Sequence, residues 1–211
     1  MFWICYSCTF AVSICLRLML TRSRFLLAIL LPVFVVSTAA AQTTMSVAPE
    51  SVLTITGRSN ESDWDVSSTV IEGELTLGDV TDALSVNALT ISVPAAEIEA
   101  PRGLIMDRIM QGSLKSDEYP TITFELTSVE LPAVPNDSLN LVAHGKFTLT
   151  GTTKDVSIDM FAKTTEDGGW HYKGSFPLTM TDYGMETPTV MFGQLRVHRD
   201  VVILFDLLFS K

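Results

Sequence analysis

Apolar and polar residues alternate along most of the chain after position 50. Between residues 121 and 127, Ile122, Phe124 and Leu126 alternate with threonines and a glutamate. A repeat of two residues is typical of a strand that turns one face to the protein interior and the other to water. The same alternation predicts eight strands, over residues 52–58, 64–77, 84–93, 119–131, 139–150, 156–164, 170–180 and 195–209.

Turn residues separate several of these strands. Gly151 can adopt the positive φ of a tight hairpin, which other residues resist. The run Glu166-Asp167-Gly168-Gly169 is a strong hairpin signal between the sixth and seventh strands. Because strands joined by short hairpins run antiparallel, the pattern predicts an antiparallel sheet.

One segment has a different period. Ile105 and Ile109, like Met106 and Met110, are four residues apart and therefore lie on one face of a helix. Pro101 stands at or just before the first turn, where a helix tolerates proline. The sequence thus predicts a single short helical insert over residues 102–114.

Eight antiparallel strands favour a closed up-and-down barrel, because closure removes the exposed edges of a sheet. A two-sheet sandwich buries one face of each strand equally well, so the periodicity alone leaves both architectures open. The last predicted strand, 195–209, is apolar on both faces near its end. We therefore expect that strand to be covered on both sides.

The N-terminus has the order of a secretory signal. In residues 19–41 two arginines precede an apolar run over 25–36, and three alanines end at Ala41. Cleavage there would leave Gln42 first and give a periplasmic or secreted protein. Residues 1–18 have no place in this scheme and are interpreted as an over-long gene model. A membrane anchor is the alternative, although the apolar run is shorter than the roughly 20 residues of a spanning helix.

The charge of the mature chain argues against nucleic acid as a partner. All 24 acidic residues follow Ala41, whereas three of the 14 basic residues precede it, so 11 basic residues remain and the formal net charge is −13. Binding to a phosphate backbone needs clustered Lys and Arg, and the chain has no basic run.

Metal and cofactor chemistry have few candidates. All three cysteines lie in the leader, at positions 5, 8 and 15, so residues 42–211 cannot form disulfides or thiolate metal sites. His144, His171 and His198 fall on three predicted strands without the spacing of metal ligands. We therefore expect no metal, no cofactor and no catalytic residue.

Two segments carry a resemblance to a known family. Glu118-Tyr119-Pro120-Thr121-Ile122-Thr123-Phe124 and Gly145-Lys146-Phe147-Thr148-Leu149-Thr150-Gly151-Thr152-Thr153-Lys154 closely resemble the YceI-like family of lipid and polyisoprenoid-binding proteins. The resemblance covers nearly all of residues 42–211. It implies a lipocalin-like, eight-stranded antiparallel barrel with a helix near one mouth and a lipid in its cavity. Many members carry a histidine soon after the first strand, where this chain has Asn60, Glu61 and Ser62 instead.

The inward strand faces and the helix supply the candidate ligand-binding residues. The strands contribute Ile122, Phe124, Phe147, Met160, Phe176, Met180 and Phe205, and the helix contributes Met106, Ile109 and Met110. No charged residue shares those strand faces, so the lining suits a long hydrocarbon chain, although an ordinary packed core would have the same pattern. The helix residues could equally well pack against the barrel.

The resulting prediction is an exported, non-enzymatic binding protein that sequesters an isoprenoid lipid, a quinone or a similar hydrophobic molecule. An isomerase-type or hydrolase-type enzyme at the barrel mouth is one alternative, and a ligand-free barrel that acts through a protein partner is another. The sequence leaves the oligomeric state open, including a homodimer.

Overall fold

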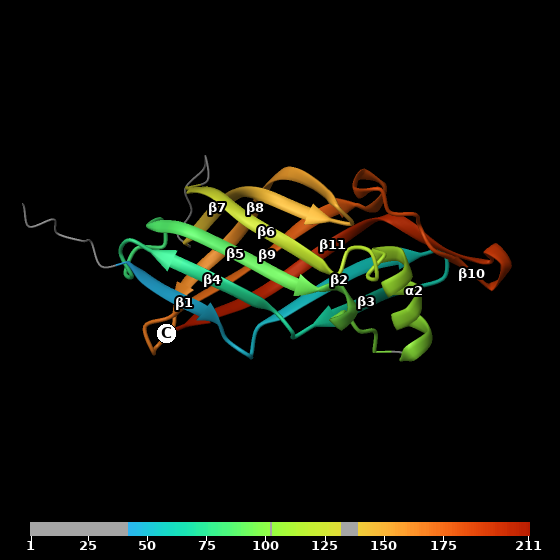
Figure 1. Ribbon diagram of the computed structural model, residues 1–211, viewed down its shortest axis with the longest axis horizontal. Helices are drawn as coiled ribbons and strands as arrows, with labels where there is room; N and C mark the ends of the chain where they lie inside the picture. Colours follow the sequence, from blue (N-terminus) through green and yellow to red (C-terminus); the bar gives the residue numbers. More distant parts are fainter. Residues whose placement is uncertain (1–41, 102, 132–138) are drawn as a thin grey trace, which may run out of the picture. The chain divides into compact units, whose positions relative to one another are not determined.

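Antiparallel strands close into an eight-stranded barrel in the computed structural model, which describes residues 42–101, 103–131 and 139–211 (Figure 1). The strands are β1 (Thr43–Val47), β2 (Val52–Ser59), β3 (Asp63–Ser68), β4 (Glu72–Leu77), β5 (Val86–Pro94), β6 (Thr121–Glu130), β7 (Asn140–Leu149), β8 (Thr152–Thr164), β9 (Trp170–Thr179), β10 (Thr189–Val190) and β11 (Leu195–Ser210). The predicted barrel is confirmed. The predicted leader and its cleavage site lie outside the described residues.

Two positions of the barrel wall are each occupied by a strand in two pieces. β11 pairs along one edge with both β1 and β2, while β1 pairs with β4 and β2 with β3. β1 therefore continues the line of β2, and β4 that of β3. Counted in this way, the wall has eight members.

The sequence pattern missed β1, because Pro49 interrupts the alternation before Val52. The buried hydroxyl of Ser51 replaces backbone hydrogen bonds to β11 where the chain is interrupted between β1 and β2. It accepts the Leu208 N–H at 2.9 Å and donates to the Leu208 carbonyl at 3.3 Å. β1 then closes the barrel by pairing with the end of β11 and with β4.

The connection from β5 to β6 covers one end of the barrel. It contains the 3₁₀ turn η1 (Ala95–Glu97) and the helix α2 (Leu104–Leu114), close to the predicted 102–114; Arg102 lies outside the described residues. Glu99 exchanges two backbone hydrogen bonds with Ser67, of 2.8 and 2.9 Å, which hold the connection against β3. Figure 1 shows α2 and β10 at this end of the barrel and the C-terminus at the other.

The predicted alternation matches the observed burial along the strands. On β7, for example, the side chains at 141, 143, 147 and 149 are buried, and Lys146 between them is exposed. The prediction that β11 is covered on both sides is wrong. Its residues Val201 and Ile203 face the core, but Leu204 on the outer face is 42% exposed, because nothing in the described chain forms a second layer there.

The two family-like segments lie side by side and meet at a turn. Thr150 and Gly151 both have positive φ, of 46° and 71°, and form the two-residue hairpin between β7 and β8. The ring of Tyr119 packs directly over Gly151, where a Cβ atom would collide with it. The Thr150 hydroxyl donates to the Tyr183 carbonyl in the 3₁₀ turn η2 (Met180–Tyr183), so these motifs shape one end of the barrel.

Within the described residues, no helix has the length and apolar character needed to cross a membrane.

Candidate functional site: the apolar interior of the barrel

Two adjoining apolar cavities lie inside the barrel. The larger has a volume of about 80 Å³, and the smaller, which Met110 and Leu114 of α2 help to line, has a volume of about 50 Å³. Five residues line both cavities: Leu53, Val93, Ile122, Phe147 and Ile203. Among the described residues, no Lys, Arg, His, Asp or Glu lines either one.

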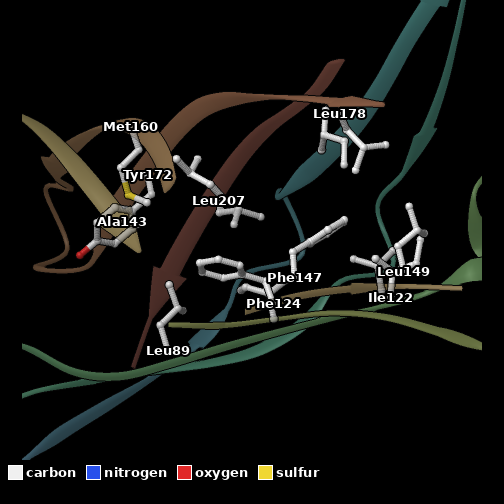
Figure 2. Close-up of a cluster of buried hydrophobic side chains, with 14 of the residues drawn as sticks. Leu89, Ile122, Phe124, Ala143, Phe147, Leu149, Met160, Tyr172, Leu178 and Leu207 are labelled. Carbon is white, nitrogen blue, oxygen red and sulfur yellow. The ribbon is translucent and has the colours of Figure 1, made fainter. Parts of the chain in front are cut away.

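Phe147 stands between the two cavities. Its ring meets Phe176 edge to face with centroids 5.4 Å apart, and Tyr183 with centroids 5.6 Å apart. Figure 2 shows Phe124 and Phe147 in the middle of the core, with Tyr172 and Met160 on one side and Leu149 and Leu178 on the other. Phe147 is thus the aromatic residue among the five that line both cavities.

Glycines on the wall leave room for aromatic rings to lie flat. Phe205 on β11 lies opposite Gly174 on β9, and an added Cβ there would come within 2.5 Å of the Phe205 ring. Trp64 lies opposite Gly57 in the same way, and its indole would collide with a Cβ at that position. Such close approach is available only to glycine. These pairs keep two large rings against the wall and preserve space in the interior.

The cavities are small for the ligand that the sequence suggests. Pockets for drug-sized ligands have volumes of about 300–1,000 Å³, so a long chain must push side chains apart to enter. Met160 lines the larger cavity, and Met110, Met180 and Met185 line the smaller. Because methionine has a flexible, unbranched side chain, it can move with little strain. The linings can therefore adapt to a ligand at the methionine positions.

The structure brings most of the predicted site residues together, although whether they contact a ligand stays a prediction. The larger cavity is lined by Ile122, Phe124, Phe147, Met160, Phe176 and Phe205. The smaller is lined by Met110, Ile122, Phe147 and Met180. Met106 and Ile109 on α2 are half-buried and line neither cavity. Of the three predicted helix residues, only Met110 packs against the buried core and reaches a cavity.

Three polar residues in the linings are absent from the predicted site, Tyr172 and Thr123 in the larger cavity and Trp64 in the smaller. Alternation already placed Tyr172 on the same face as Phe176, and Trp64 begins a predicted strand. The alternation thus indicates both positions, whereas an expectation of purely apolar lining residues leaves them out. Tyr172 is 5% exposed, and burial raises the pKa of its phenol, which therefore stays protonated.

The histidines lie outside the barrel interior, on three different strands as predicted. His144 Nδ1 is 2.8 Å from the Ser157 hydroxyl and its Nε2 is 2.8 Å from Glu130 Oε1. Ser157, His144 and Glu130 lie on β8, β7 and β6, and none of them lines either cavity. The contacts tie the three strands together across the outer wall.

A second outer contact joins β9 to β11. Asp206 is 2.9 Å from Lys173 Nζ and 2.5 Å from His171 Nε2. The hydrogen bond from Lys173 lowers the pKa of the Asp206 carboxyl, and His171 adds to the effect. Among residues 42–101, 103–131 and 139–211, no group of three His, Cys, Asp or Glu side chains is placed to hold a metal.

Known structures share this fold at low sequence identity. BcnA from Burkholderia cenocepacia has a TM-score of 0.65 and 14% identity, with 78% of this chain and 99% of that chain covered. A polyisoprenoid binding domain from Saccharophagus degradans, implicated in plant cell wall breakdown, has a TM-score of 0.61 and 10% identity, with coverage of 81% and 99%. The YceI protein of Campylobacter jejuni has a TM-score of 0.54 and 15% identity, with coverage of 73% and 85%.

A search of curated proteins finds no match. The family model described as the YceI-like domain matches residues 34–209, which is most of the chain. This match agrees with the barrel, with the helix at one end, and with the two sequence segments that meet at the β7–β8 hairpin. The chain belongs to the YceI-like family.

Proposed function

We propose that this chain is an exported binding protein that holds a long apolar molecule, such as an isoprenoid lipid or quinone, inside its barrel. The adjoining cavities with charge-free apolar linings carry the proposal. Each CH₂ group moved from water into such a lining contributes about 0.8 kcal/mol. The polyisoprenoid binding domain from Saccharophagus degradans has the same fold, which supports this choice of ligand class.

The energetics favour a chain long enough to join the two cavities. About ten buried CH₂ groups would contribute about 8 kcal/mol, against the cost of ordering the ligand and displacing side chains. A chain confined to one cavity would gain only part of this energy. The bound state therefore requires Phe147 and the lining methionines to move aside.

A titration with decylbenzoquinone tests the proposal, because quinones quench indole fluorescence. Residues 42–211 contain two tryptophans: Trp64 lines the smaller cavity, and Trp170 stacks on Tyr172, which lines the larger. Protein stripped of lipid should show saturable quenching at one equivalent. Benzoquinone without the chain is the control and should quench only in proportion to its concentration. Equal behaviour of the two compounds would contradict the proposal.

The same sample separates the alternatives. An isomerase-type or hydrolase-type enzyme would change the mass or the structure of an isoprenoid ester or alcohol incubated with it. A barrel that acts through a protein partner would bind neither decylbenzoquinone nor the isoprenoid compound. A binding protein should return its ligand chemically unchanged.

We also propose that residues 1–41 are removed during export. The order of basic, apolar and small residues that ends at Ala41 supports cleavage before Gln42. The intact mass of the exported protein should then correspond to residues 42–211. A mass that includes the leader, or release from membranes only by detergent, would support an anchored protein instead.

A further inference from the structure

Tyr172 places a single phenol in the larger cavity. The residue lies on β9, opposite Leu207 of β11 and Ala162 of β8, and points into the barrel. Its ring is fixed by stacking on Trp170, with centroids 6.0 Å apart, and by an edge contact with Phe209 at 5.8 Å. The phenol therefore has a defined position in an otherwise apolar space.

The hydroxyl of Tyr172 is buried and has no hydrogen-bond partner among the described residues. Buried polar groups are nearly always paired, because an unpaired one keeps the full cost of leaving water. The other lining residues around it are mostly aliphatic or aromatic; Thr123 has the only other side chain with a hydroxyl. The phenol therefore has no partner among the described residues, and a molecule that enters the cavity can supply one.

The smaller cavity also contains a buried polar group without a hydrogen-bond partner among the described residues. Trp64 Nε1 is also buried and unpaired within the described chain, although the residue as a whole is only half-buried. The unpaired groups that line the two cavities can both donate a hydrogen bond, and no cationic side chain of the described residues accompanies them. A phosphate or carboxylate would be poorly stabilised here, since a buried charge needs a charged or multiply bonded partner.

From this geometry we infer that Tyr172 donates a hydrogen bond to an uncharged acceptor oxygen on the ligand, a carbonyl, ether or hydroxyl oxygen, and so fixes which end of the chain lies in the larger cavity. The inference rests on the proposed function. The acceptor lies at the Trp170 end of the barrel, and the hydrocarbon chain runs past Phe147 toward α2. Figure 2 shows Tyr172 and the Leu149–Leu178 group on opposite sides of Phe147.

The variant Tyr172→Phe tests the inference with two probes, decylbenzoquinone and decylbenzene, which differ in their carbonyl oxygens. Loss of one hydrogen bond to the quinone should weaken its binding about tenfold. Binding of decylbenzene, measured by its displacement of the quinone, should change less than twofold. Without ligand, Tyr172→Phe should melt at a higher temperature than the wild type, because an unpaired buried hydroxyl has been removed.

Tyr183→Phe is the matched control. Tyr183 is also buried, but it lines neither cavity, so its loss of a hydroxyl should affect neither probe. The orientation of the bound quinone is measured separately, with variants that each keep one tryptophan. Quinone bound at Tyr172 should quench the fluorescence of Trp64→Phe, which keeps Trp170, more strongly than that of Trp170→Phe, which keeps Trp64.

The outcomes separate the inference from the function on which it rests. If the wild type binds both probes and Tyr172→Phe binds the quinone equally well, the inference is wrong and the binding function stands. A lower melting temperature of ligand-free Tyr172→Phe would also overturn it, because the hydroxyl would then be paired with a resident water molecule. If the wild type binds neither probe saturably, the proposed function itself fails.

Discussion

Phe147→Ala should lower the free energy of unfolding of the lipid-free protein by about 3–5 kcal/mol, the usual cost of truncating a buried phenylalanine. The same change should strengthen the binding of bulky or branched chains. The reason is that Phe147 lines both cavities and contacts Phe176 and Tyr183, so its removal joins the two spaces. Urea denaturation gives the first quantity, and titration with a quinone that carries a branched chain gives the second.

Leu141→Ala provides the matched control. Leu141 lies on the same strand and is 1% exposed, but it lines neither of the two cavities. Its truncation should cost about 2–5 kcal/mol and leave binding unchanged. If Phe147→Ala and Leu141→Ala both lose stability and neither alters binding, the barrel interior is a packed core rather than a ligand site.

Trp170→Ala should lower the free energy of unfolding by a similar amount, about 3–5 kcal/mol. Trp170 is 2% exposed, and its indole N–H donates to the Val80 carbonyl at 3.0 Å, which ties the β4–β5 loop to β9. The ring also supports Tyr172 in the larger cavity. We therefore expect faster release of a bound quinone as well as lower stability, measured by dilution and by denaturation.

Trp170→Phe separates the two contributions of this residue. It keeps an aromatic ring beside Tyr172 but removes the hydrogen bond to the β4–β5 loop and part of the buried indole, at a cost of about 1–3 kcal/mol. Ligand release should stay close to that of the wild type. A loss equal to that of Trp170→Ala would mean that contacts made only by the indole, rather than an aromatic ring beside Tyr172, determine the stability.

Much of the barrel could be predicted because its strands follow a simple period. The alternation in 139–150 and 156–164 places the side chains of β7 and of most of β8 on the observed faces, although β8 begins at Thr152, within the predicted turn. β1 could not be predicted in this way, because it is five residues long and Pro49 separates it from β2. Its strand character depends on pairing with β4 and β11, which are distant in sequence.

The sequence predicts which side chains of the candidate site point inward, but not which of them reach a cavity. An inward position says that a side chain leaves water, not whether it meets a cavity or another side chain. Met106 and Met110 share a helical face in the sequence, yet only Met110 reaches a cavity. The space itself depends on pairs such as Gly174 with Phe205, whose contact follows from the pairing of β9 with β11.

Thr123 illustrates the same difficulty on a strand. It alternates with the buried Ile122 and Phe124, as expected for a side chain on the outer face, yet the residue is half-buried and is included in the lining of the larger cavity. It would be a poor control for a cavity variant. Lys146, which is exposed on β7 next to Phe147, is a better one.

Native mass spectrometry of the protein purified from its own host, without added lipid or detergent, tests the central claim most directly. We predict a one-to-one complex with a hydrocarbon chain of defined mass, which organic extraction recovers unmodified and with an uncharged oxygen-containing end group. Protein that carries no such chain, and that takes up none from a lipid extract of the same host, would contradict the account.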